Sequence, residues 1–171
     1  MKRLFLLRHA KAGRDDPALS DFERPLTGRG IGDSEAMGAR LAGLGVRPAL
    51  VLCSPAVRTR ATWDAMAPAL RAGTAAFPAE LYGATWGEIL DRLWRTPAGV
   101  DSVLLVGHNP GTEELALHLA DAAASPDGDG LLRMRRKFPT CAVAVFRFPL
   151  DEWALLSPRS CLLDAFLTPK A

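Results

Sequence analysis

Three short apolar runs constrain the fold of this chain more than any other feature. They are RLFLLRH at residues 3–9, PALVLCS at 48–54 and SVLLVGH at 102–108. Continuous runs of Val and Leu of this length are typical of strands that are buried on both faces within a parallel sheet. Each run is followed by a stretch with helical features, and alternating strands and helices indicate an α/β fold.

The stretches after the three runs carry signals for the start of a helix. After the first run, apolar residues recur at helical spacing between Thr27, a predicted N-cap, and Gly45, which suits a left-handed helix stop. After the second and third runs, Ser54 and Asn109 are the predicted N-caps, and the proline that follows each is the predicted first helical residue. Each strand is therefore expected to lead directly into a helix.

The rest of the chain completes a three-layer α/β/α sandwich with a mostly parallel central sheet. The sequence contains no internal repeat and no boundary of a second domain, so we expect one domain over residues 1–171. The further expected elements are a short strand at 75–80, a helix at 86–95, a surface loop at 121–130 and an edge strand pair at 140–148 and 153–158.

Composition excludes several classes of function. The chain has 21 basic and 19 acidic side chains, and a net charge of +2 does not suggest a general nucleic-acid binder. Cys53, Cys141 and Cys161 form no C-x-x-C pair, which argues against a disulfide framework or a zinc site and suits a reducing cytoplasm. No apolar stretch is long enough to span a membrane. A cytoplasmic protein is expected, with a monomer as the default because no heptads occur.

Polar residues follow the three predicted strands at the points where the strands end. Arg8 and His9 end the first, Ser54 ends the second with Arg58 one helical turn later, and His108 ends the third. Ligands of parallel α/β sheets bind beyond the carboxyl ends of the strands. Helix N-termini favour anions, and arginine forks match the oxygens of a tetrahedral oxyanion. The sequence therefore predicts a phosphate site.

With a phosphate at this edge, His9 is the candidate nucleophile. Neutral imidazole attacks phosphorus and gives a phosphohistidine intermediate that water hydrolyses, while Arg8, Arg58 and a protonated or donating His108 hold the oxygens. The scheme needs no metal and no cofactor. The three histidines form no metal-binding motif, and His118 is expected to be structural. Cys53 is expected only to pack in its strand.

Four segments resemble the histidine phosphatase superfamily, which is phosphoglycerate mutase-like, and within it the SixA-type phosphohistidine phosphatases. The resemblance runs over nearly the whole chain and implies that fold without a large lid insertion. It also implies the phosphohistidine mechanism, with the family's signature residues at Arg8, His9, Arg58 and His108. Ala10 departs from the usual glycine. The segments are LLRHAKA (6–12), RPLTGRG (24–30), CSPAVRTRAT (53–62) and VGHNPGTEELA (106–116).

Larger members of the superfamily carry a carboxylate general acid, for which Glu80 is the candidate; an ordinary surface position is the alternative. Too few residues separate Glu80 from His108 to build a lid. An open site suits a phosphate on a protein surface. An imidazole leaving group, with a pKa of about 6.5, also needs less protonation than an alkoxide. The sequence therefore predicts metal-independent hydrolysis of phosphohistidine on proteins.

Two alternatives stay open from the sequence. One is a broad phosphomonoesterase that acts on small phosphate esters, and the other is a non-catalytic module that binds phosphoproteins with the same residues. Arg24 and the basic run at 133–137 would extend the positive rim toward an acidic phosphoprotein. An ion pair of Arg24 with Asp21 or Glu23, and a solvated helix face for the run, are the competing interpretations.

Overall fold

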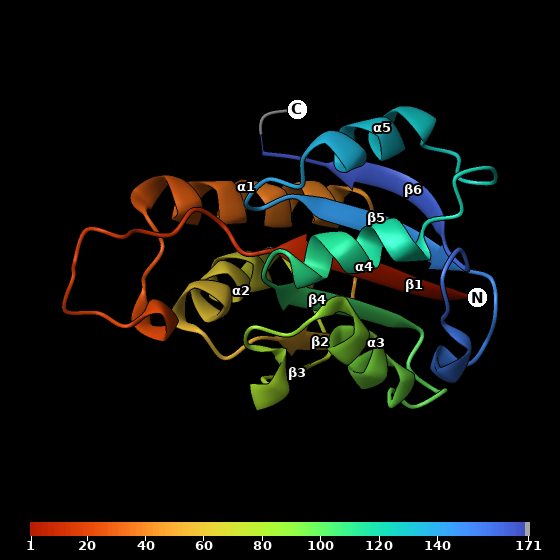
Figure 1. Ribbon diagram of the computed structural model, residues 1–171, viewed down its shortest axis with the longest axis horizontal. Helices are drawn as coiled ribbons and strands as arrows, with labels where there is room; N and C mark the ends of the chain where they lie inside the picture. Colours follow the sequence, from red (N-terminus) through yellow and green to blue (C-terminus); the bar gives the residue numbers. More distant parts are fainter. Residues whose placement is uncertain (170–171) are drawn as a thin grey trace.

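A six-stranded sheet forms the middle of the molecule in the computed structural model, which describes residues 1–169 (Figure 1). The strand order is β3-β2-β4-β1-β5-β6. The first four strands in this order are mutually parallel, but β5 is antiparallel to β1, and β6 is antiparallel to β5. The sheet is therefore mixed and not mostly parallel. The strands are β1 (Lys2–Arg8), β2 (Leu50–Cys53), β3 (Thr74–Ala76), β4 (Ser102–Gly107), β5 (Val143–Phe148) and β6 (Leu162–Leu167).

Helices cover both faces of this sheet (Figure 1). On one face lie α1 (Gly28–Gly43) and α2 (Val57–Leu70). On the other lie α3 (Trp86–Trp94), α4 (Gly111–Leu119) and α5 (Gly128–Arg136). Short 3-10 helices occur at η1 (Asp21–Glu23), η2 (Ala79–Leu81) and η3 (Trp153–Leu155). No helix within residues 1–169 is long and apolar enough to cross a bilayer.

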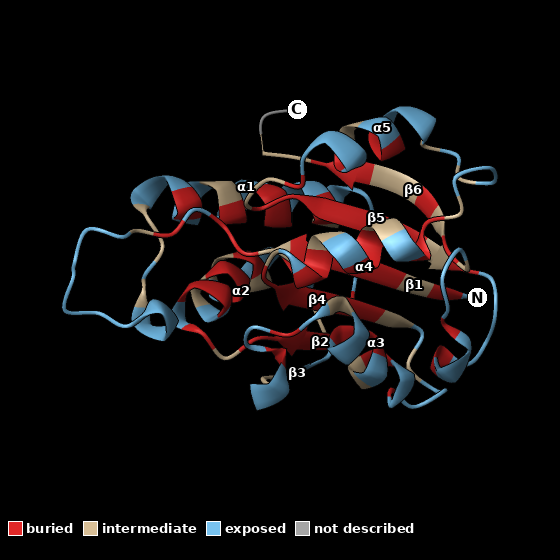
Figure 2. Ribbon diagram, viewed as in Figure 1, coloured by how far each residue is buried: buried red, intermediate tan, exposed pale blue. Residues whose placement is uncertain are grey.

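The sequence of β1 is continuously apolar because both faces of this strand are buried. Successive side chains of a strand point to opposite faces, so Leu4 and Leu6 pack with α3, α4 and α5, whereas Phe5 and Leu7 pack with α1 and α2. All four side chains are fully buried, and Figure 2 shows the central strands as the buried layer. Each such side chain contributes about 1.5–3 kcal/mol by leaving water. Burial on both faces thus fixes β1 firmly at the centre.

The expected strand at 153–158 is wrong. Trp153 begins the 3-10 helix η3, is buried and donates its indole N–H to the carbonyl of Val100 at 2.7 Å. Trp153 and Leu156 of this segment therefore fill the core under α3, whereas Leu155 is exposed. The strand that pairs with β5 is β6, whose Asp164 bonds to Arg147 of β5 at 2.7 Å. A charged residue in the middle of β6 is tolerated because its ion partner lies on the neighbouring strand.

The predicted N-caps after β2 and β4 are also wrong. The helices α2 and α4 begin later, with Ala56 and Pro110 at their N-cap positions. Ser54 and Asn109 lie outside the helices, where their side chains bond to other partners. The segment expected as a loop at 121–130 already contains the first turn of α5, capped by Asp127. The expected elements at 75–80 and 86–95 correspond to the shorter strand β3 and to α3.

Candidate active site

His9 directly follows β1, and its backbone is bonded to the neighbouring segment on each side. Its N–H donates to the carbonyl of Gly107 at 3.0 Å, and its carbonyl accepts from the N–H of Cys141 at 3.0 Å. The imidazole Nδ1 lies 2.7 Å from the carbonyl oxygen of Ala10. A carbonyl oxygen can only accept, so Nδ1 carries the proton. The lone pair is therefore on Nε2, which accepts from Arg58 Nε at 3.3 Å.

The surroundings of His9 keep its imidazole neutral. Burial lowers the pKa of His9 to about 4, and the charges of Arg58, Arg8 and Arg24 act in the same direction. The hydrogen bond to the Ala10 carbonyl opposes them. The neutral imidazole expected from the sequence is thus favoured more by burial than by the nearby arginines.

Arg58 lies in the first turn of α2, and its side chain is almost completely buried. Besides His9, its guanidinium bonds to Asp21 through the backbone carbonyl at 2.7 Å and the carboxylate at 3.0 Å. Thr62, one turn later, accepts the backbone N–H of Ala10 at 3.0 Å and donates to the carbonyl of Arg58 at 2.7 Å. These bonds fix α2 against the end of β1.

His108 follows β4 and faces His9, with 5.4 Å between the ring centroids. Its Nε2 lies 2.7 Å from the hydroxyl of Ser54, which also accepts from the N–H of Ala56 at 3.5 Å. Burial, followed by the charges of Arg58 and His9, lowers the pKa of His108 to about 3. His108 is thus a neutral imidazole with hydrogen-bonding capacity. Its Nδ1 is buried and has no partner within the described chain.

Arg8, the last residue of β1, lines two neighbouring cavities of the protein surface, which are described below. One of its terminal nitrogens donates to the carbonyl of Phe138 at 3.0 Å. Its Nε is buried without a hydrogen-bond partner among residues 1–169. Burial lowers the pKa of Arg8, and Glu113 opposes that shift. A buried N–H without a partner is costly, and a bound oxyanion would supply one.

Sequence reasoning did not identify Asp21 and Tyr82 as site residues. The carboxylate of Asp21 accepts from the Tyr82 hydroxyl at 2.6 Å, from Arg24 at 2.9 Å and from Arg58 at 3.0 Å. The hydrogen bonds from Tyr82 and Arg24 lead the causes that hold the pKa of Asp21 well below its usual range. Arg24 therefore forms the anticipated ion pair with Asp21. No sequence pattern links Asp21 to Tyr82, because only the fold brings η1 and η2 together.

These side chains surround a cavity of about 510 Å³ at the carboxyl ends of β1, β2 and β4. His9, His108 and Tyr82 line it together with the carboxylate of Asp21. Arginine forks beside a neutral imidazole form a suitable environment for a phosphoryl group. The basic residues that line this cavity are Arg8, Lys11, Arg14, Arg24 and Arg58.

Glu80 does not line the cavity. It lies in η2, and its carboxylate is 3.3 Å from Arg95 and 3.6 Å from Arg92. Its side chain is thus engaged by Arg92 of α3 and by Arg95, the residue that follows α3. Tyr82, two residues after Glu80, does line the cavity.

The other candidates considered from the sequence lie outside the cavity. His118 is in α4 and stacks on Trp86, with 4.0 Å between ring centroids. Cys53 is buried in β2, and burial raises the pKa of its thiol to about 12. Within residues 1–169, no three His, Cys, Asp or Glu side chains are grouped as metal ligands would be.

Known proteins resemble the chain over nearly its whole length, although no family model matches it. An uncharacterised protein of Mycobacterium tuberculosis is 34% identical over 164 residues, which cover 96% of this chain and 100% of the relative. A structure assigned as the phosphohistidine phosphatase SixA of Nakamurella multipartitia is 32% identical, with a TM-score of 0.84 and coverage of 99% and 97%. The protein histidine phosphatase SixA in complex with tungstate is 28% identical, with a TM-score of 0.78 and coverage of 98% and 97%.

The agreement with these structures covers nearly the whole chain and not only the four motif segments. Arg8, His9, Arg58 and His108, which carry the resemblance in the sequence, lie together around one cavity. The chain therefore belongs to the histidine phosphatase superfamily of hydrolases, as one of its SixA-type members.

Proposed function

We propose that this protein hydrolyses phosphohistidine on other proteins, without a metal, through a phosphohistidine formed on its own His9. The observation that carries the proposal is the state of His9. Its imidazole is neutral, its proton is held on Nδ1 by the Ala10 carbonyl, and its Nε2 lone pair faces Arg58 in a cavity rich in arginine.

In the first step, Arg8 and Arg58 hold the oxygens of the phosphoryl group, and His108 donates a hydrogen bond. The lone pair of His9 Nε2 forms a bond to phosphorus while the phosphorus–nitrogen bond of the substrate breaks. The substrate ring takes up a proton from water on its other nitrogen, so it leaves with that electron pair as neutral imidazole. The positive charge that develops on the His9 ring is stabilised through Nδ1–H by the Ala10 carbonyl.

In the second step, water attacks the phosphorus of phosphorylated His9. The bond between phosphorus and Nε2 breaks, its electron pair returns to the imidazole, and inorganic phosphate leaves with the oxygen of the water. The proton that this water gives up replaces the one that the solvent supplied in the first step. His9 is then neutral again with its proton on Nδ1. The low pKa of His9 favours this neutral product and therefore favours turnover.

The carboxylates near the site favour an imidazole leaving group. Asp21 accepts three hydrogen bonds that keep it ionised, so it is a poor proton donor. Glu80 contacts Arg92 and Arg95, which favours a surface ion pair over the general-acid role considered from the sequence. An imidazole with a pKa of about 6.5 leaves without strong acid assistance, whereas the oxygen of an alkyl ester requires it. Glu80→Gln is therefore expected to leave phosphohistidine hydrolysis unchanged.

Similar solved structures support the same substrate class. The similar structures carry the names phosphohistidine phosphatase and protein histidine phosphatase. One of them binds tungstate, a tetrahedral oxyanion like phosphate. These likenesses support a phosphoprotein substrate for the cavity around His9.

The test measures phosphate release in EDTA from a phosphohistidine protein, a phosphoserine peptide and an aryl phosphate. We expect selective release from phosphohistidine by wild type and loss of about a thousandfold or more in His9→Ala, because no other group forms the covalent intermediate. His118→Gln, which changes a histidine outside the cavity, is the matched control and keeps full activity.

Four other results would contradict the proposal. Activity that survives His9→Ala would show that His9 is not the nucleophile. Dependence on an added metal would show that the mechanism is not metal-independent. A preference for the phosphate esters would instead indicate a general phosphomonoesterase. Binding of the phosphoproteins without any phosphate release would indicate a non-catalytic binding module.

A further inference from the structure

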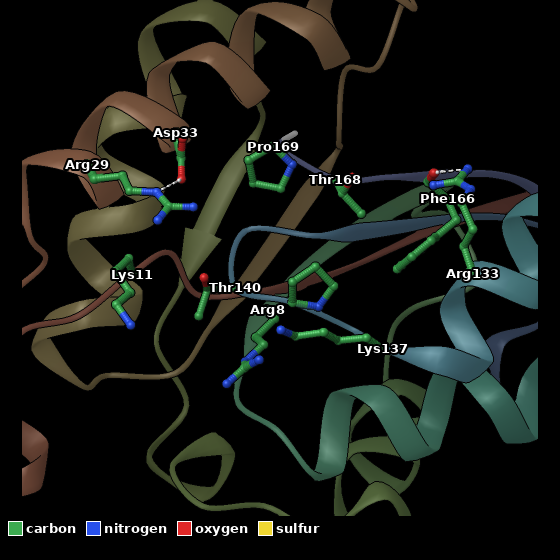
Figure 3. Close-up of a pocket in the computed structure, with 11 residues that line it drawn as sticks. Arg8, Lys11, Arg29, Asp33, Arg133, Lys137, Thr140, Phe166, Thr168 and Pro169 are labelled. Carbon is green, nitrogen blue, oxygen red and sulfur yellow. Dashed lines mark hydrogen bonds and ion pairs between the residues drawn. The ribbon is translucent and has the colours of Figure 1, made fainter. Parts of the chain in front are cut away.

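A second cavity, of about 680 Å³, adjoins the cavity of His9. Arg8, Lys11 and Thr140 line both, so the two hollows share one wall. Figure 3 shows the second cavity between the start of α1, which supplies Arg29, and the end of α5, which is followed by Lys137. We call this second cavity the basic groove. Any substrate that presents a phosphoryl group to His9 lies next to it.

The charge of the basic groove is only partly neutralised within the protein. Arg133 is engaged, since it bonds to Asp129 at 3.0 Å and to the carbonyl of Phe166 at 2.9 Å. Arg29 makes a longer contact of 3.7 Å with Asp33, the one carboxylate that lines the groove within the described residues.

The remaining cations of the groove have spare hydrogen-bonding capacity. Lys11 and Lys137 are exposed, and their ammonium groups make no ion pair or hydrogen bond to any residue in the range 1–169. Arg8 adds a buried Nε without a partner on the wall that both cavities share. Positive charge is therefore available along the groove from the phosphate site outward, and a matching ligand must be anionic.

The form of the groove favours a protein segment over a small anion. Its ammonium and guanidinium groups are carried by long side chains from separate parts of the fold, the end of β1, the start of α1 and the end of α5. Dispersed cations of this kind suit several carboxylates along a chain, whereas a single phosphate needs a compact cradle.

We propose that the basic groove binds an acidic segment that lies beside the phosphohistidine on the substrate protein. This inference rests on the proposed function, because it assigns to the substrate a surface next to the phosphoryl group. Contacts of this kind act mainly on encounter and on KM, and they weaken as salt screens the charges. The groove thus selects among phosphohistidine proteins while His9 performs the same chemistry on all of them.

The test compares two synthetic phosphohistidine peptides that differ only in their flanking residues, glutamate in one and glutamine in the other. At low ionic strength we expect kcat/KM of wild type to be about tenfold higher for the glutamate peptide, because several exposed ion pairs act together. Lys137→Glu is expected to reduce this preference severalfold and to leave the glutamine peptide unaffected within about twofold. Arg29→Glu, on the opposite side of the groove, is expected to do the same.

Arg135→Glu is the matched control. Arg135 lies on α5 two residues before Lys137, is exposed and does not line the groove, yet the variant changes the net charge equally. We expect it to keep the preference. Equal turnover of the two peptides by wild type would overturn the inference, as would an equal loss in Arg135→Glu. Failure to hydrolyse either peptide would refute the proposed function itself.

Discussion

Acidification should destabilise this protein well above the pH at which its carboxylates are protonated. His9 and His108 are both buried, and burial is the first cause that lowers their pKa values, to about 4 and about 3. In the unfolded chain each imidazole takes up a proton near pH 6.5. Between pH 6.5 and the folded pKa values, the unfolded state therefore binds more protons, and the free energy of unfolding falls as the pH falls.

The size of the effect follows from these pKa values. At pH 5, an imidazole with a pKa of 6.5 is protonated in about 97% of unfolded chains, whereas His9, with a pKa of about 4, is still neutral in about 90% of folded ones. The linkage corresponds to about 2 kcal/mol for His9 and a similar amount for His108. We expect the free energy of unfolding to be about 4 kcal/mol lower at pH 5 than at pH 7.5.

Urea unfolding at the two pH values, in wild type and in His9→Asn, measures this effect. The variant lacks one of the two groups, so its dependence on pH should be about half that of wild type. Nitrogen NMR of the imidazoles should show a neutral His9 with its proton on Nδ1 at pH 5, and His118→Gln serves to assign the signals. A His9 midpoint near 6.5, or equal stability at the two pH values, would refute the reasoning.

Four further substitutions test separate parts of the structure. Thr62→Val removes the acceptor of a buried backbone N–H beside His9, and urea unfolding should show a loss of about 1–3 kcal/mol. Gly30→Ala would drive a methyl group into the backbone of Lys11 and should cost about 1–3 kcal/mol in the same assay. Gly32→Ala, in the same helix with open space around it, should instead be stabilising. Asp21→Asn removes a negative charge beside Arg58, so tungstate should bind up to about fivefold more tightly by calorimetry. An unchanged affinity would show that Asp21 does not compete with the anion.

The sequence predicts the centre of this fold well because burial acts there directly on residue type. The runs that form β1, β2 and β4 are apolar throughout, since helices cover both faces, and the polar residues at their ends converge as parallel strands require. Arg8, His9, Arg58 and His108 could therefore be placed together from the sequence.

The edges were harder to predict because long-range partners determine them. Asp164 makes β6 look unlike a strand until its ion pair with Arg147 is known, and Trp153 looks like part of a strand until its place under α3 is known. Asp21 is likewise placed in the site by long-range contacts. Its segment has no periodic pattern, and its contact with Tyr82 joins residues that are far apart in the chain.

His9 lies directly after the central strand β1, and this position determines which parts of the protein can vary when its substrate preference changes. Its backbone is tied to the ends of both neighbouring segments, and the strand before it has no free edge. The residues around the phosphoryl group come largely from connections, such as those that carry Lys11, Asp21 and Tyr82. Sequence change in these connections can therefore reshape the approach of a partner while the nucleophile keeps its place, so chemistry and recognition can vary independently.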